Sequence, residues 1–326
     1  MSRLAVVGAG AWGTALAQAI AGAGQEVALW GRDAGQVAEM ETTGENARYL
    51  PGVRLHPAVA PTADLATAMA GASAVLVVTP AQTLSDMLPA IGTAAGRPLP
   101  LVLCAKGIER GTGRLMSDIA EELLPGFAVA ALSGPSFAAD VARGLPTAVT
   151  IAARDLELAG DLAALVSGAS FRCYSSDDLV GVELGGALKN VLAIAAGAAH
   201  GAGLGASAQA ALVTRGFVEL RRLADSYGAR PETLMGLSGL GDLMLTCASE
   251  KSRNFAFGAA LGRGESLAGL PLAEGAFTAG IAARIARERG VAAPIIEAVD
   301  HILEGRLTIA AAVTALMSRP LRSETD

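Results

Sequence analysis

A glycine-rich turn near the start of the chain sets the strongest limit on its fold. Residues 3–7 (RLAVV) form an apolar run, as a buried parallel strand does, and residues 10–23 are rich in alanine and indicate a helix. Between them lie Gly8, Gly10 and Gly13 in the pattern GxGxxG. A tight turn, a close approach of backbone to a pyrophosphate and close helix–strand packing each require one of these glycines. The order of strand, glycine turn and helix predicts a dinucleotide-binding unit.

Apolar runs alternate with helical patterns through the first half of the chain. After a second strand at residues 26–30 (EVALW), the expected elements are strands at 74–79, 99–104, 128–132 and 147–152 and helices at 63–70 and 81–91. Such alternation is typical of an α/β fold in which helices cover a mostly parallel sheet. We therefore expect a Rossmann-type, doubly wound sheet in this part of the chain.

The pattern changes near Asp177, after which only helices are expected. Their ranges are 178–200, 207–227, 276–289, 293–303 and 308–317, with Ser207 as the expected cap of the second. A chain of 326 residues is long enough for two domains. We predict a dinucleotide-binding domain at 1–178 and an all-α substrate and catalytic domain at 179–326.

Composition excludes several classes of protein. A hydrophobic content of 52% allows large cores, and a net charge of −6 gives no reason to expect nucleic acid as a partner. Three distant cysteines suit a reducing compartment, and three scattered histidines predict no metal site. The uncharged stretches 4–25 and 190–214 hold too much glycine and alanine for a signal peptide or a membrane-spanning helix. We expect a cytoplasmic protein without membrane insertion.

The residues after the second strand bear on the choice of cofactor. An acidic residue there usually binds the adenosine ribose of NAD, whereas an arginine accommodates the 2′-phosphate of NADP. Here the strand is followed by Gly31, Arg32 and Asp33. Arg32 favours NADP(H), and Asp33 leaves NAD(H) open; a plain surface turn is the alternative.

Lysine is rare in this chain: of 25 basic residues only Lys106, Lys189 and Lys251 are lysines. A surviving lysine is a candidate for a task that needs a compact, titratable ammonium. Lys106 follows the strand at 99–104, at the sheet edge where ligands bind. Lys189 lies in an apolar helix, where burial is costly without a partner such as Asp242. Chance survival, or a lysine that reaches out to solvent, is the alternative.

A short polar segment follows Lys251. Ser252, Arg253 and Asn254 supply a hydroxyl, a planar fork of donors and an amide in direct succession. That set suits an anion such as phosphate. An exposed loop is the structural alternative.

Seven motifs together resemble the bacterial NAD(P)-dependent glycerol-3-phosphate dehydrogenases. They are GAGAWGTALA (8–17), CAKGIE (104–109), LSGPSFA (132–138), GGALKNVLAIAAG (185–197), GLGDLMLTC (239–247), SRN (252–254) and AEG (273–275). They cover nearly the whole chain in the family's order and spacing. The family more often has Ser-Tyr where this chain has Ala11 and Trp12.

The resemblance implies a reversible reduction of dihydroxyacetone phosphate to sn-glycerol 3-phosphate, which supplies phospholipid synthesis. Contacts to NAD(H) or NADP(H) would come from the turn and beyond: Gly8, Gly10, Ala11, Trp12, Gly13, Arg32, Lys106, Ala138, Arg253, Leu272 and Glu274. The triose phosphate would be surrounded by Lys106, Gly134, Ser136, Lys189, Asp242, Ser252, Arg253 and Asn254. Lys189 would exchange the proton, Asp242 and Asn190 would orient it, and Lys106 would help to fix the substrate.

Two other functions share part of these features. A β-hydroxyacid dehydrogenase has the same two-domain plan and a GGxxKN-like helix, but the CAKG, LSGPS and SRN segments favour a triose phosphate. A non-catalytic dinucleotide sensor needs the glycine turn but not Lys189 with Asp242. The apolar second domain is consistent with a possible homodimer.

Overall fold

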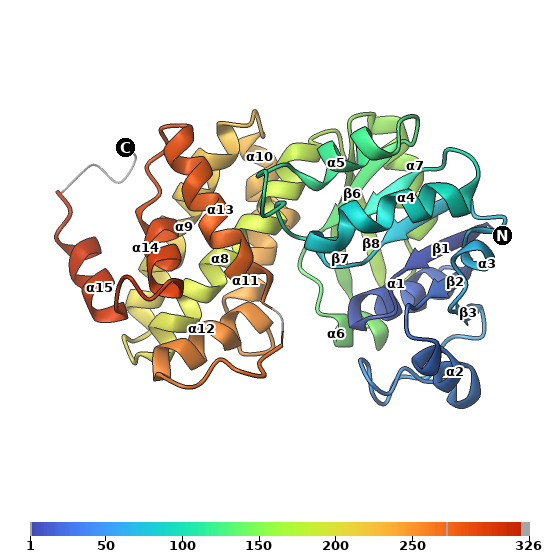
Figure 1. The fold of residues 1–326 in the computed structure, drawn as a ribbon, viewed down its shortest axis with the longest axis horizontal. Coiled ribbons are helices and arrows are strands. Elements are labelled where there is room, and N and C mark those ends of the chain that lie inside the picture. Colours follow the sequence, from blue (N-terminus) through green and yellow to red (C-terminus); the bar gives the residue numbers. More distant parts are fainter. Residues whose placement is uncertain (1, 272, 321–326) are drawn as a thin grey trace. The chain divides into compact units, whose positions relative to one another are not determined.

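A single sheet of eight strands forms the centre of the N-terminal half, within residues 2–271 and 273–320 that this computed structural model describes (Figure 1). In spatial order β3-β2-β1-β4-β5-β6-β7-β8, only the β6–β7 pair is antiparallel. The strands are β1 (Arg3–Val7), β2 (Glu26–Trp30), β3 (Val59–Thr62), β4 (Ala74–Val77), β5 (Leu101–Leu103), β6 (Val129–Ser133), β7 (Thr147–Ala153) and β8 (Phe171–Ser176). Strand order reverses between β1 and β4, and the carboxyl ends of strands at such a point form a ligand-binding crevice.

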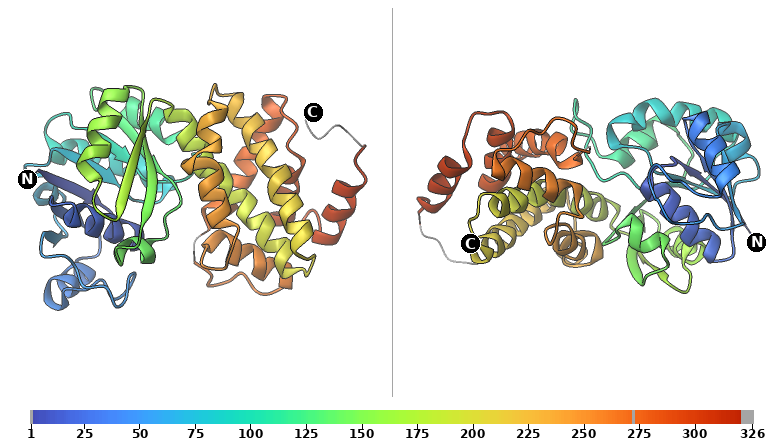
Figure 2. Two further views of the ribbon diagram at one scale, coloured as in Figure 1. Left: turned by 180° about the vertical axis from the view of Figure 1, so that it is seen from behind. Right: turned by 90° about the horizontal axis from the view of Figure 1, so that it is seen from below.

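Helices cover both faces of this sheet (Figure 2). They are α1 (Ala11–Gly22), α2 (Ala34–Thr43), α3 (Leu65–Met69), α4 (Leu84–Ala95), α5 (Met116–Leu123), α6 (Ala138–Ala142) and α7 (Leu156–Val166). Side chains of β1 alternate between two cores: Leu4 and Val6 pack with α1, α2 and α7, while Ala5 and Val7 pack with α3, α4 and α5. The predicted α/β, doubly wound class is confirmed.

The C-terminal half is helical. Its elements are α8 (Leu179–Gly201), α9 (Ala206–Asp225), α10 (Pro231–Met235), the π-helical turn η2 (Leu237–Gly241), α11 (Asp242–Thr246), α12 (Arg253–Arg263), α13 (Glu274–Glu288), α14 (Pro294–Leu303) and α15 (Ile309–Met317). Glycines let α8 and α12 approach closely, since a Cβ on Gly197 would lie 2.1 Å from the Phe255 carbonyl oxygen. Of the helices described, α8 alone is long and apolar enough to cross a membrane, but 89% of its most apolar window is buried, as in a core helix.

The chain folds into two compact units, and each unit is built from two separate segments of the chain. One unit contains Met1–Gly186 and Ala229–Asp242, and the other contains Ala187–Gly228 and Leu243–Asp326. The expected boundary at 178/179 lies at the first residue of α8, whereas the units divide inside that helix. The assignment of 1–178 and 179–326 as domains therefore stays a prediction.

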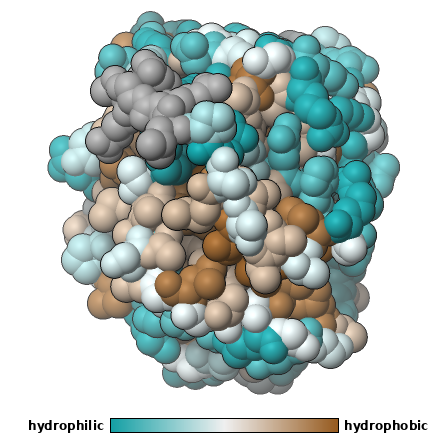
Figure 3. Space-filling model, turned by 90° about the vertical axis from the view of Figure 1, so that its left-hand side faces the viewer, coloured by the Kyte–Doolittle hydropathy of each residue, from teal (hydrophilic) through white to brown (hydrophobic). Residues whose placement is uncertain are grey.

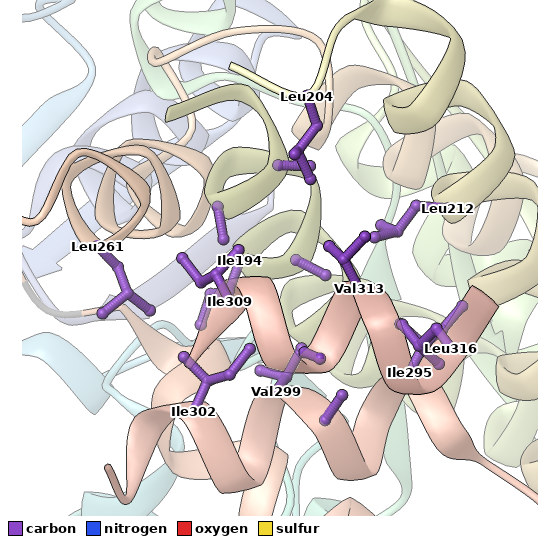
Figure 4. A pocket seen from close by; sticks show the side chains of 15 residues that line it. Ile194, Leu204, Leu212, Leu261, Ile295, Val299, Ile302, Ile309, Val313 and Leu316 are labelled. Carbon is purple, nitrogen blue, oxygen red and sulfur yellow. The ribbon is translucent and has the colours of Figure 1, made fainter. Parts of the chain in front are cut away.

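Helix α15 is weakly packed in the second unit. Only Ala312 of this helix is buried, and Met317 is 81% exposed. Apolar residues gather on the face of the molecule shown in Figure 3. Beneath α15 lies a cavity of about 50 Å³, lined by aliphatic side chains that include Ile194, Val299 and Leu316 (Figure 4). The packing between α8, α14 and α15 is thus incomplete.

Candidate active site

The glycine turn after β1 leaves room for a ligand at one position and none at two others. Gly8 has a φ of +125°, and a Cβ there would lie 2.8 Å from the carbonyl oxygen of Val78. A Cβ on Gly13 would lie 1.8 Å from the Gly8 carbonyl oxygen. At Gly10, by contrast, a Cβ would meet no atom within 4 Å. Gly8 and Gly13 are therefore required by packing, and the space above Gly10 is open to a phosphate.

Polar groups around this turn fit a bound dinucleotide. Helix α1 begins at Ala11 without a side-chain cap, so its first N–H groups point toward the space above the turn. Within the described part of the chain, the indole Nε1 of Trp12 and the Oγ1 of Thr79 are buried without a hydrogen-bond partner. Buried polar atoms usually have partners, so both are suited to contact a ligand.

Asp33 and Arg32 have different surroundings after β2. The Oδ1 of Asp33 accepts hydrogen bonds from Gly35 N (3.0 Å) and Gln36 N (3.2 Å), which caps α2, and its Oδ2 pairs with Arg48 at 3.1 Å. The Gln36 hydrogen bond, with those of Gly35 and Arg48, lowers the pKa of the Asp33 carboxyl. Arg32 is exposed. The Asp33 carboxylate is thus already hydrogen-bonded, whereas the exposed Arg32 guanidinium is available for a 2′-phosphate.

Lys106 lies on the loop after β5, and its ammonium has two close acceptors. Its Nζ donates to Gly134 O at 3.0 Å and to Asp242 Oδ2 at 2.7 Å. The Asp242 side chain is 2% exposed and that of Lys106 is 19% exposed. Gly186 allows this arrangement, because a Cβ there would lie 2.6 Å from Ser133 Oγ and 3.5 Å from Lys106 Cγ. A nearly buried, charge-assisted pair holds the lysine in one position.

Further predicted residues lie around the same carbonyl group. Ser136 Oγ donates to Gly134 O at 3.0 Å, and Ala138 is the first residue of α6. The sheet unit therefore brings together Lys106, Gly134, Ser136 and Asp242. The segment around Asp242 is helical.

Lys189 is buried in the middle of α8. Its residue is 5% exposed, and Nζ donates to Thr246 Oγ1 at 2.5 Å. Sequence reasoning missed Thr246, although it lies in the motif that contains Asp242 and follows it by one helical turn. The expected pairing of Asp242 with Lys189 stays a prediction.

Asn190 and Asn254 join three helices of the second unit. Asn254 Nδ2 donates to Asn190 Oδ1 at 3.0 Å, and Asn254 Oδ1 accepts from Gly275 N at 2.9 Å. Ser252 caps α12, with its Oγ accepting from Phe255 N at 3.3 Å. The polar segment is thus a helix N-terminus rather than a loop.

Two of the remaining predicted residues begin helices of this unit. Arg253 is the first residue of α12 and is exposed, as is Lys251. Glu274 is the first residue of α13. Leu272 lies outside the described residues. The contacts of Arg253, Leu272 and Glu274 to phosphate or cofactor stay predictions, and no role is predicted for Lys251.

A doubly wound sheet with a glycine turn at its switch point, and a lysine fixed at the same edge, defines a dinucleotide-dependent dehydrogenase of the Rossmann type. Models of the NAD-dependent glycerol-3-phosphate dehydrogenase N-terminus and C-terminus match residues 3–159 and 178–314. The chain belongs to this family.

Individual relatives agree with that assignment. A glycerol-3-phosphate dehydrogenase (NAD(P)+) of Mesorhizobium japonicum is 65% identical over 99% of this chain and 94% of that protein. One from Chelativorans sp. is 64% identical over 98% of each chain. The crystal structure of the Coxiella burnetii glycerol-3-phosphate dehydrogenase has a TM-score of 0.92 at 37% identity, covering 98% of this chain and 99% of that one. The predicted family and its NAD(P) cofactor class are confirmed.

Proposed function

We propose that this protein catalyses the reversible reduction of dihydroxyacetone phosphate to sn-glycerol 3-phosphate with NADPH or NADH. The observation that carries the proposal is the fixed Lys106–Asp242 pair at the carboxyl edge of a sheet whose glycine turn fits a dinucleotide. In a cell this reaction would supply the glycerol phosphate backbone of phospholipids. Three free cysteines are consistent with a cytoplasmic location.

When bound, a reduced nicotinamide would supply a hydride to the ketone carbon, and negative charge would grow on the ketone oxygen. We assign the protonation of that oxygen to Lys189, whose ammonium is shielded from water. Thr246 orients the ammonium through its hydroxyl, and Asn190 follows it directly in the same helix. A low exposure strengthens the interaction of the ammonium with the developing charge.

Substrate positioning depends on both phosphate and carbonyl contacts. Lys106, held by Asp242 and Gly134, presents a fixed ammonium to the substrate. Arg253, at the exposed first position of α12, suits a phosphate together with the Ser252 and Asn254 segment. Binding of the phosphate then places the carbonyl for reaction.

The test is the loss of NADPH absorbance on addition of dihydroxyacetone phosphate, repeated with NADH. We expect turnover with this substrate, and no gain of NADPH or NADH absorbance when 3-hydroxy acids that lack phosphate are offered with NADP+ or NAD+. Turnover of the 3-hydroxy acids instead would favour a β-hydroxyacid dehydrogenase. Tight NADPH binding without turnover of either would favour a non-catalytic sensor.

We also propose that the protein is a homodimer without membrane insertion. Leu204 and Met317 of the helical unit expose apolar side chains. Apolar residues also gather on the face of the molecule shown in Figure 3, and a contiguous exposed apolar patch often marks a protein interface. Light scattering after gel filtration should give twice the monomer mass of 32.6 kDa. A mass of one chain at micromolar concentration would contradict the dimer.

A further inference from the structure

The loop that carries Lys106 is anchored by a side chain that none of the roles above includes. This loop runs from Cys104 to Leu115, between β5 and α5, and contains no helix or strand. Backbone N–H and C=O groups in such a segment need partners from elsewhere in the protein. Gln82 supplies two: its Nε2 donates to Ile108 O at 2.8 Å, and its Oε1 accepts from Arg110 N at 2.9 Å.

Both bonds from one amide fix the loop relative to the sheet. Gln82 lies in the short helical turn η1 (Ala81–Thr83), which comes soon after β4. The side chain of Ile108 is buried at 1% exposure, so this part of the loop is also held by packing. Lys106 is only two residues before Ile108. Gln82 therefore anchors the loop backbone close to Lys106, while Gly134 and Asp242 hold the ammonium group at the end of the Lys106 side chain.

A second set of hydrogen bonds closes the loop beyond this anchor. The Glu109 carboxylate accepts from Ser85 Oγ at 2.9 Å and from Arg114 Nε at 3.1 Å, and also from the Thr112 hydroxyl. These bonds, that of Thr112 above all, lower the pKa of Glu109. Ser85 belongs to α4, so Glu109 ties the loop to the helix that follows Gln82.

We propose that Gln82 is a positioning residue for Lys106, which acts by fixing the loop backbone and not by touching the substrate. The proposal rests on the proposed function, in which Lys106 holds the triose phosphate. Without the Gln82 amide, Ile108 O and Arg110 N lose these hydrogen bonds, and the backbone of Lys106 is no longer held in one position. A misplacement of about 1 Å can lower kcat/KM by as much as ~100-fold.

Three variants test the proposal: Gln82→Ala, Gln82→Glu and, as a matched control, Thr83→Ala in the same turn. The Thr83 hydroxyl donates only to Pro80 O among the contacts described, at 2.8 Å, and does not reach the loop. We expect kcat/KM for dihydroxyacetone phosphate to fall about tenfold or more in Gln82→Ala, mainly through KM, and to stay unchanged in Thr83→Ala.

The Gln82→Glu variant adds a pH profile that general loss of stability would not produce. A carboxylate can accept from Arg110 N but cannot donate to Ile108 O, whereas a protonated carboxyl can do both. Relative to the unmodified protein at each pH, kcat/KM of Gln82→Glu should therefore recover as the pH falls toward the range where glutamate is protonated. The same ratio for Gln82→Ala should stay low at every pH.

Amide hydrogen exchange measures the anchor without any activity. In Gln82→Ala the Arg110 N–H loses its acceptor, so peptides from residues 104–115 should exchange faster than in the unmodified protein. Unchanged exchange would overturn the anchor. Faster exchange with unchanged kcat/KM, or a flat pH ratio for Gln82→Glu, would overturn its role in positioning Lys106. If the unmodified protein does not turn over dihydroxyacetone phosphate, the proposed function fails, and the exchange data alone then decide on the anchor.

Discussion

Lys106 and Lys189 carry the same charge in different surroundings. Lys106 is partly exposed and pairs with the carboxylate of Asp242, which compensates its charge. Lys189 is nearly buried, and the Thr246 hydroxyl accepts its hydrogen bond. An arginine would fit neither place well, because its planar guanidinium needs more room and does not give up a proton. This difference supports a holding role for Lys106 and a proton-transfer role for Lys189.

Replacement of Lys189 by alanine should reduce kcat at least ~100-fold, by the usual size of acid–base effects, while NADPH still binds. Lys189→Arg should not restore turnover. Steady-state rates with NADPH and dihydroxyacetone phosphate, together with cofactor fluorescence, measure both quantities. Near-normal turnover in Lys189→Ala would remove this lysine from the reaction.

Arg32→Asp should move the cofactor preference toward NADH. Loss of a hydrogen bond to a charged phosphate costs about 1.5–3 kcal/mol, so the ratio of kcat/KM for NADPH over NADH should fall roughly 10- to 100-fold. Arg54→Asp is the control, because this exposed arginine lies beyond the other end of α2. An equal change in both variants would indicate a general charge effect.

At the level of elements, Glu219 links α9 to the start of α14. Its carboxylate accepts hydrogen bonds from Ile295 N and Ile296 N, at 2.9–3.1 Å. Burial nevertheless raises the pKa of Glu219 to about 7, because these hydrogen bonds do not fully offset the loss of water. The folded protein therefore holds this proton more tightly than the unfolded chain does.

The raised pKa of Glu219 predicts a pH-dependent stability. The protonated Glu219 contributes up to about 3 kcal/mol to the free energy of unfolding. This contribution is fully present below about pH 4.5 and is lost as the pH rises to about 7. Glu219→Gln cannot titrate, so its free energy of unfolding should fall less over that range. Urea unfolding of both proteins at several pH values measures the difference. Parallel curves would show that Glu219 does not titrate there.

The cavity under α15 predicts a stabilising substitution. Ala298 of α14 lines it and is only half-buried, so a larger side chain there can fill the space. Ala298→Leu should raise the free energy of unfolding by up to about 1 kcal/mol, and Ala208→Leu, on the exposed side of α9, should change it little. Thermal unfolding checks both. A lower midpoint for Ala298→Leu would show that the cavity cannot accept the side chain.

Sequence patterns predicted most buried strands and the long C-terminal helices, but missed the edge strands and several helices, among them α5 and α7, although both bury apolar residues. The predicted ranges of β1 and β2 agree with the structure, because both strands are buried in the sheet. Strands β3 and β8 were missed since they lie at the sheet edges, where β3 contains Pro61 and β8 reads FRCYSS. The expected Ser207 cap was wrong: α9 begins at Ala206, after Gly205 in a conformation with positive φ.

The candidate site shows the same division. Its charged members could be found from motifs, because lysines are rare and the glycine turn has fixed spacing. Their partners could not, since the Thr246 hydroxyl and the Gln82 amide act through three-dimensional proximity that no local pattern encodes.

At the scale of the whole molecule, the sheet unit is not one continuous stretch of chain. Residues Ala229–Asp242 belong to it, although most of the chain after Gly186 does not. This returning segment supplies Asp242, the partner of Lys106. The sheet unit is therefore completed only after the first helices of the other unit have been made.

This path has a consequence for how the two halves of the gene could recombine. A chimera joined at 178/179 would take Lys106 from one parent and Asp242 from the other, although the two side chains meet at 2.7 Å. Exchange between relatives at that point would be tolerated only where both parents carry a matching pair. A recombination breakpoint near the start of α8 would therefore separate Lys106 from Asp242, although both residues belong to the same structural unit.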